Sequence, residues 1–97
     1  MNVVALTGEL KNIGEIKQKP DGTPLIRFEV GVMNKSESIP DFVDCVVYGR
    51  TAERMQEWER GIKISVKGRL HLQSDINTDG TRRKSAEVIA EAVELIK

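Results

Sequence analysis

Aromatic residues and cysteine are scarce in this sequence. Phe, Trp and Tyr together account for 4% of its 97 residues, and Cys45 is the single cysteine. One cysteine excludes an intrachain disulfide, and its place inside an apolar run predicts a buried thiol. The sequence has no apolar run long enough to span a membrane and no charged segment followed by an apolar one, as a signal peptide would have. We therefore expect a cytoplasmic protein.

An excess of charge of one sign is also missing. Fifteen Lys and Arg residues balance fifteen Asp and Glu residues. Nucleic-acid binding usually rests on a basic excess, so here it would need a local cluster of charge and would be sensitive to salt. The content of 39% hydrophobic and 31% charged residues predicts one globular domain, residues 1–97. A domain of this size has a modest core, to which oligomerisation would add stability.

The residues that most enzymes need are equally scarce. His71 is the only histidine, and it falls on the polar side of a predicted strand, where a lone histidine lacks the partners that acid–base catalysis requires. The sequence contains no cluster of cysteine and histidine for zinc and no glycine-rich phosphate loop. We predict a protein that is not an enzyme and that uses no metal and no cofactor.

What the sequence does contain is a series of short apolar segments. Four are predicted strands, because apolar residues alternate with polar ones or form short runs, and they cover residues 3–10, 25–33, 41–48 and 62–73. The turn that follows them favours the start of a fifth strand near Arg83, in the most ambiguous segment. Gly8 predicts a bulge or bend in the first strand. Proline and Asp-Gly pairs predict turns at residues 19–24 and 77–80, and residues 34–40 form a polar loop.

One helix is predicted between the third and fourth strands. It begins at Thr51, whose hydroxyl can cap it, and ends at Gly61, a residue suited to a helix end. Ala52, Met55 and Trp58 form one apolar stripe, so Trp58 is expected to pack under the helix. Five strands with a helix in this place are the order of an OB-fold, an all-β Greek-key barrel that often binds oligonucleotides across strands two and three.

The segment 85–96 allows two interpretations. Its strong helix formers and the spacing of Ile89, Val93 and Ile96 favour a helix. As a strand it needs a bulge, because the apolar alternation shifts between residues 88–90 and 93–95.

Two of the few aromatic residues fall on one predicted strand. Phe42 and Tyr48 have the same parity, with Asp44 and Val46 between them, so both rings point to one side. Single strands are held by aromatic rings on which bases stack and by basic residues that neutralise phosphates. The alternative is that both rings are core, although the Tyr48 hydroxyl favours a polar edge. Asp44 on the same face opposes phosphate binding.

Candidate basic residues are distributed over the predicted strands and the final hairpin. They are Lys17, Arg27, Lys35, Arg50, Lys67, Arg69, Arg82, Arg83 and Lys84. Each alone is most simply a solvated surface charge. Together they predict a basic stripe that could track a phosphate backbone.

The sequence resembles bacterial and phage single-stranded DNA-binding proteins over nearly its whole length. The resemblance begins with VVALTGEL at 3–10, is strongest at CVVYGR (45–50) and VKGRL (66–70), and ends with EVIAEAVEL at 87–95. It implies a strand at 83–90, then a turn and a short closing strand. It also implies that Phe42 and Tyr48 stack bases, that Lys17 and Arg50 lie near the DNA, and that chains form tetramers or dimers.

Three features depart from that family. Loops 34–40 and 74–82 lack the further stacking aromatics, the 97 residues contain no flexible linker with an acidic tip, and the net charge is zero. We therefore expect a weaker or narrower site and no recruitment of partners through an acidic tip.

Three functions remain open at this stage. The first is sequence-independent binding of single-stranded DNA, with RNA as an alternative ligand, in replication, recombination or repair in the cytoplasm, the nucleoid or a phage or plasmid setting. The second is a tail-less primosomal protein similar to the replication-restart N protein. The third is a protein-interaction OB module with little DNA binding, because a fold does not fix a function.

Overall fold

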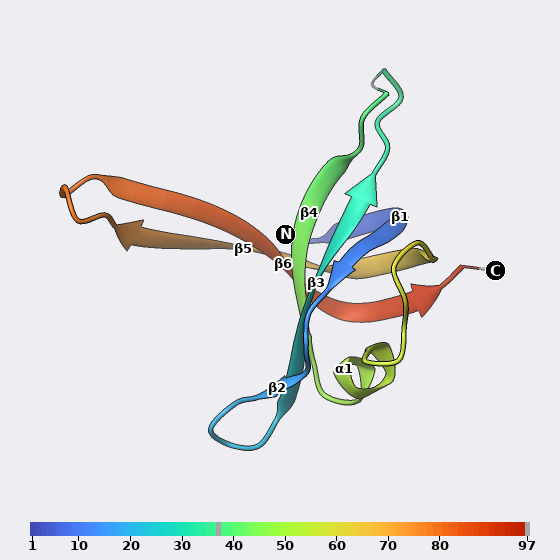
Figure 1. The fold of residues 1–97 in the computed structure, drawn as a ribbon. Coiled ribbons are helices and arrows are strands. Elements are labelled where there is room, and N and C mark those ends of the chain that lie inside the picture. Colours follow the sequence, from blue (N-terminus) through green and yellow to red (C-terminus); the bar gives the residue numbers. More distant parts are fainter. Residues whose placement is uncertain (37, 97) are drawn as a thin grey trace.

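Five long strands close into a ring in the computed structural model, which describes residues 1–36 and 38–96 (Figure 1). The strands are β1 (Val4–Ile13), β2 (Lys17–Gln18), β3 (Pro24–Val32), β4 (Asp41–Tyr48), β5 (Lys63–Ile76) and β6 (Arg82–Leu95), and the helix is α1 (Arg50–Met55). The hydrogen-bonded order is β1-β5-β6-β4-β3, β3 pairs again with β1, and the two-residue β2 lies at the edge. This closed order, with the helix between β4 and β5, confirms the predicted OB-fold barrel.

The core fills the inside of this barrel. Alternate residues of each strand point inward, and they are almost entirely apolar. The core residues are Leu10, Ile26, Phe28, Val30, Cys45, Val47, Ala52, Met55, Ile64, Val66, Val88, Ala90 and Val93. The prediction of a buried Cys45 is confirmed: burial raises the pKa of its thiol to about 12, and the carboxylates of Asp44 and Glu87 add to the effect. This thiol stays protonated and unreactive at neutral pH.

Helix α1 is shorter than predicted, so the expected range from Thr51 to Gly61 was wrong. Its N-cap is Gly49, with φ 80°, and it ends at Met55. The chain turns after Met55 because it must reach β1, where the Gly61 N–H donates to the Leu10 carbonyl at 2.8 Å. Gly61 does have a positive φ of 97°, but in this later turn. Trp58 is half-buried and packs against the core, as predicted.

Strand β6 is continuous, so the predicted turn and separate closing strand were wrong. Lys67 of β5 pairs with Ala92 and Gly68 pairs with Ala90, which leaves Glu91 as an extra residue. Because of this bulge, the buried side chains change from the even-numbered Val88 and Ala90 to the odd-numbered Val93. This is the change of alternation for which the sequence predicted a bulge. The strand alternative for this segment is therefore confirmed with its bulge.

Of the bulge or bend predicted at Gly8, the bulge is not formed. It pairs regularly with Ile64, and the irregularity of β1 lies between Leu10 and Asn12 instead. A Cβ atom at Gly8 would lie 2.2 Å from the carbonyl oxygen of Gly31. Glycine is present here because two backbones approach closely, and not because the strand bulges.

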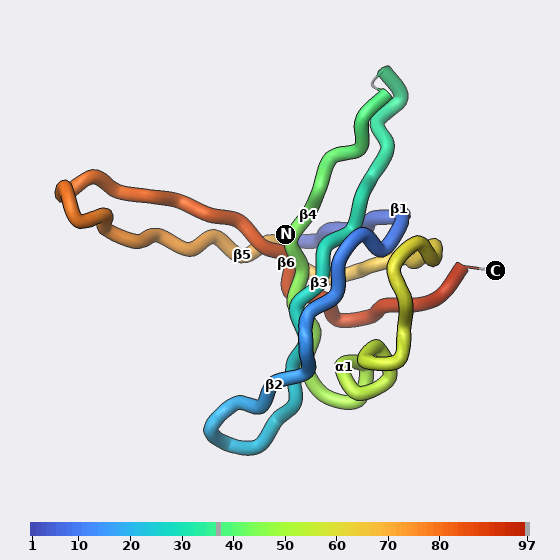
Figure 2. Tube along the Cα trace, viewed as in Figure 1, coloured from blue at the N-terminus to red at the C-terminus, as the bar shows by residue number. Residues whose placement is uncertain are grey.

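Strands β5 and β6 continue beyond the barrel as a two-stranded arm, residues 70–88, visible in the tube trace as the long extension (Figure 2). The arm ends in a turn where the Asn77 N–H donates to the Thr81 carbonyl at 2.8 Å. Gly80 has φ 87° in this turn, and Gly22 has φ 91° in the turn at residues 19–23, so both predicted turns are confirmed. Leu72 and Ile76 are 63% and 75% exposed, because no second layer covers the arm's apolar face.

Two residues lie outside the description: Glu37, within the predicted polar loop 34–40, and Lys97. Among the residues described, no helix has the length and apolar character that crossing a membrane requires.

Candidate nucleic-acid interface

The outer face of β3 and β4 carries both candidate aromatics. On this face the register pairs Tyr48 with Leu25 and Phe42 with Gly31. Phe42 is 56% exposed and Tyr48 is 39% exposed, so both rings lie outside the core and on one side of β4. Six residues of extended strand separate them, which corresponds to roughly 20 Å. The predicted orientation is confirmed, and the alternative of two core rings is wrong.

Basic residues gather at the Tyr48 end of this face. Lys17 of β2 pairs with Leu25, which pairs in turn with Tyr48, so these three form one row across the sheet. Arg50 is exposed and follows Tyr48 by two residues at the start of α1. The sequence predicted both basic residues, and the register places Lys17 in the row of Tyr48.

Lys19 is a neighbour of Tyr48 that the sequence did not reveal. Its Nζ lies 5.4 Å from the centroid of the Tyr48 ring, a cation–π contact. The turn that carries it is fixed by two backbone hydrogen bonds, from the Lys19 N–H to the Thr23 carbonyl at 2.9 Å and from the Gly22 N–H to the Lys19 carbonyl at 2.8 Å. The predicted turn before the second strand was the available signal, but the contact depends on the register of β3 with β4.

A second row crosses four strands beside the first. Arg27 of β3 pairs with Val46 of β4, Val46 with Ile89 of β6, and Ile89 with Arg69 of β5. Two predicted basic residues thus flank an apolar centre, roughly 14 Å apart at about 4.8 Å per strand. Val46 is completely buried although it is on the outer face.

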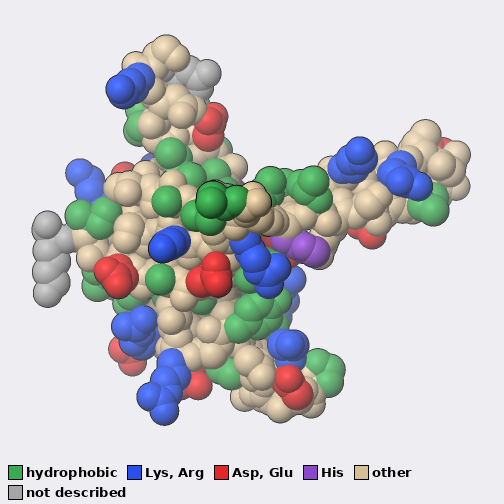
Figure 3. All heavy atoms as spheres, turned by 180° about the vertical axis from the view of Figure 1, so that it is seen from behind, with side chains coloured by type: hydrophobic (Ala, Val, Ile, Leu, Met, Phe, Trp, Pro, Cys, Tyr) green, Lys and Arg blue, Asp and Glu red, His purple; other side chains and the backbone are tan. Residues whose placement is uncertain are grey.

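The remaining predicted basic residues lie elsewhere. Lys67 pairs with Ala5 and Ala92, farther around the barrel. Arg82 and Arg83 lie at the far end of the arm, where an Arg83 nitrogen is 3.8 Å from a carboxylate oxygen of Asp75. The space-filling view from behind shows basic and acidic side chains interspersed over the surface (Figure 3). The structure does not join all of the predicted basic residues into a single stripe.

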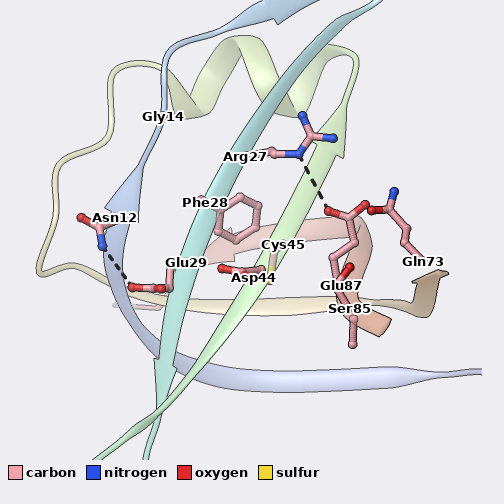
Figure 4. Close-up of a pocket in the computed structure, with 11 residues that line it drawn as sticks. Asn12, Gly14, Arg27, Phe28, Glu29, Asp44, Cys45, Gln73, Ser85 and Glu87 are labelled. Atoms are coloured by element: carbon pink, nitrogen blue, oxygen red, sulfur yellow. Dashed lines mark hydrogen bonds and ion pairs between the residues drawn. The ribbon is translucent and has the colours of Figure 1, made fainter. Parts of the chain in front are cut away.

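An acidic hollow of about 450 Å³ lies where the arm leaves the barrel, and it is lined by residues of β1, β3, β4, β5 and β6 (Figure 4). Its carboxylates come from Glu29, Asp44 and Glu87. Arg27 Nε lies 3.8 Å from Glu87 Oε2, and the Asn12 amide donates to Glu29 Oε1 at 3.0 Å. Among residues 1–36 and 38–96, no group of His, Cys, Asp and Glu side chains is arranged to hold a metal ion. Because Asp44 lines the hollow and lies between Phe42 and Tyr48 on β4, this part of the outer face is negatively charged. The sequence predicted this unfavourable charge from Asp44.

Comparison with known proteins identifies the family of this chain. The model of the single-strand binding protein family matches residues 1–96. A single-stranded DNA-binding protein of Fusobacterium nucleatum is 35% identical over 97% of this chain, and single-stranded DNA-binding protein 3 of Clostridium acetobutylicum is 33% identical over all of it. The chain spans 66% and 72% of these two relatives, and 61% of a single-stranded DNA-binding protein of Halalkalibacterium halodurans.

A solved structure gives the same result for the fold. The crystal structure of a deletion mutant of the single-stranded DNA binding protein from Thermus aquaticus matches with a TM-score of 0.77 and 26% identity. The match covers all of this chain and 42% of that one. With matches in both sequence and fold over its full length, the chain belongs to the single-strand binding protein family.

Proposed function

We propose that this protein binds single-stranded DNA without reading its sequence, in replication, recombination or repair. The observation that carries the proposal is the pair of exposed rings, Phe42 and Tyr48, on one outer face of β4 in a member of this family. Every base offers a flat ring face, so stacking on aromatic side chains tolerates any sequence. The names of the relatives support the same ligand.

The bound strand would run over the outer face of β3 and β4 from one ring to the other. Its phosphates would lie near the basic residues at the Tyr48 end, where Lys17, Lys19 and Arg50 gather. In the middle of the path they would keep away from Glu29 and Asp44, because like charges repel. This division explains how a chain with zero net charge can hold DNA.

We also propose that the protein acts as a homo-oligomer, a dimer or a tetramer. The small core and the exposed apolar side chains of the arm, Leu70, Leu72 and Ile76, support this.

A titration of labelled oligo-dT, followed by fluorescence anisotropy at two salt concentrations, tests the function. We expect saturable binding that weakens as salt rises, because Lys and Arg displace counterions from the phosphates. A titration with oligo-dA and oligo-dC should give similar affinities if stacking dominates. Absence of binding even at low salt would contradict the proposal and favour the protein-interaction module.

Neutralising Asp44 is expected to strengthen binding. Asp44 is exposed between the two rings, and two charges roughly 7 Å apart in water interact by about 0.6 kcal/mol, so Asp44→Asn should raise the affinity at low salt by about threefold. The gain should fade at high salt, because added ions screen this repulsion.

Glu94→Gln is the matched control, since Glu94 is exposed and pairs with Ser65 on another part of the barrel. An equal gain in both variants would show that only net charge matters. No gain in Asp44→Asn would place the DNA path away from the acidic hollow.

A further inference from the structure

The arm leaves the barrel at the point where β1 begins. β1 and β5 pair from Glu9 with Lys63 back to Val4 with Gly68. Continued by two residues, this antiparallel register places residue 2 opposite Leu70, the first arm residue of β5. The backbone ladder has ended there, so the N–H and C=O of Leu70 on this edge need another partner.

The side chain of Asn2 supplies that partner. Its amide nitrogen donates to the Leu70 carbonyl at 2.8 Å, and the Leu70 N–H donates to the Asn2 amide oxygen at 2.8 Å. A carboxamide carries one acceptor and a donor in nearly the geometry of a peptide group. Asn2 therefore adds one more peptide-like rung to the sheet, between segments 68 residues apart in sequence.

Strand β6, the other strand of the arm, also contacts the barrel close to this point. Pairing of β4 with β6 ends at Cys45 and Val88. One residue further, Glu87 is 17% exposed and forms the 3.8 Å ion pair with Arg27 of β3. Beyond these contacts the two strands of the arm pair only with each other among residues 1–36 and 38–96, so the base of the arm determines the direction in which it points.

We propose that Asn2 is a positioning residue that holds the base of the arm against the barrel, and that it thereby presents the basic residues of the arm to a bound single strand. The presentation of basic residues to a bound strand rests on the proposed function. The basic residues concerned are Arg82, Arg83 and Lys84, near the arm's turn. Without the two hydrogen bonds at Leu70, the contacts between the base of the arm and neighbouring strands would be reduced to the pairing of Val88 with Cys45 and the Arg27–Glu87 ion pair.

Amide hydrogen exchange tests directly whether Asn2 holds the base of the arm. In Asn2→Ala we expect the Leu70 amide to exchange about tenfold faster. The Leu70 N–H loses its acceptor, and the Leu70 carbonyl loses the hydrogen bond from the Asn2 amide. Amides in the barrel, such as that of Val30, should keep their rates. Asn2→Asp retains an acceptor for the Leu70 N–H but turns an oxygen toward the Leu70 carbonyl, so its rate should also rise. Val3→Ala is the matched control, because Val3 is exposed and lies next to Asn2.

Oligonucleotides of two lengths test whether the arm presents its basic residues to a bound strand. We choose about 5 and about 16 nucleotides, which bracket the low and high ends of the site size of one OB-fold. In Asn2→Ala the longer oligo-dT should bind about fivefold more weakly, whereas the shorter one, confined to the barrel face, should change by less than about twofold. Val3→Ala should change neither.

An unchanged exchange rate at Leu70 in both Asn2 variants would overturn the proposal. So would an equal loss of affinity for both lengths, which would indicate general destabilisation. If the unaltered protein binds neither oligonucleotide, the proposed function fails, and the exchange rates still decide whether Asn2 holds the arm.

Discussion

Replacing both Phe42 and Tyr48 by alanine is expected to weaken the binding of oligo-dT by roughly 30-fold to 10⁴-fold. Each base stacked on an aromatic ring contributes about 1–3 kcal/mol, so two rings contribute about 2–6 kcal/mol, and each 1.4 kcal/mol corresponds to a factor of ten. The dependence on salt should stay nearly the same, because neither ring neutralises a phosphate. The measurement is the anisotropy titration at two salt concentrations.

The double variant should fold, because neither ring belongs to the core. Phe42 lies opposite Gly31 and Tyr48 opposite Leu25 on the outer face. Thermal unfolding should therefore move by only a few degrees, as is usual for surface substitutions. Leu95→Ala is a matched control, since it also removes an exposed apolar side chain, at the far end of β6. An unchanged affinity in the folded double variant would show that bases do not stack on these rings.

The sequence predicted what depends on local pattern. A period of two located the strands, and the parity of Phe42 and Tyr48 was enough to place both rings on one face. The arm shows the limit of this pattern. Leu72 continues the alternation of Ile64 and Val66, yet it lies outside the barrel. Alternation reports that a strand has an apolar face, but it does not report whether another layer covers that face.

Element ends were predicted less well, because tertiary pairing decides them. The residues 85–96 are strong helix formers, but propensity differences of about 0.7 kcal/mol or less per residue are easily overridden by tertiary contacts. These residues belong to β6, which pairs with β5 from Ile64 with Leu95 to Ile76 with Arg82. Helix α1 likewise ends at Met55, because the chain then turns toward β1, where the Gly61 N–H donates to the Leu10 carbonyl.

Contacts between distant strands could not be predicted at all. The cation–π contact of Lys19 with Tyr48 and the rung between Asn2 and Leu70 depend on register across the sheet. The sequence contains eight lysines and four asparagines, and nothing local distinguishes Lys19 and Asn2 from the others. The candidate interface is therefore predictable in its aromatic residues and in Lys17, and not in the contact of Lys19, which depends on register.

Replacing Gly8 by alanine is expected to destabilise the protein strongly. The added Cβ would lie 2.2 Å from the Gly31 oxygen and 3.0 Å from the Gly31 carbonyl carbon, both backbone atoms of β3. Two paired strands cannot move aside as a flexible side chain can, so the cost should reach the upper end for overpacking, about 3 kcal/mol. For a domain of this size that loss lowers the melting temperature by roughly 12–24 °C. Thermal and urea unfolding measure it.

Gly14→Ala separates this steric effect from the general effect of replacing a glycine in this part of the chain. Its Cβ would lie 3.3 Å from the Arg27 carbonyl oxygen, a tight contact that small shifts relieve. We expect Gly14→Ala to change stability by less than about 1 kcal/mol, because alanine also restricts the unfolded chain. Equal melting temperatures for the two variants would contradict the close approach of β1 and β3 at Gly8. A large difference would show that this glycine is required by the closure of the barrel, where β1 passes from β5 to β3.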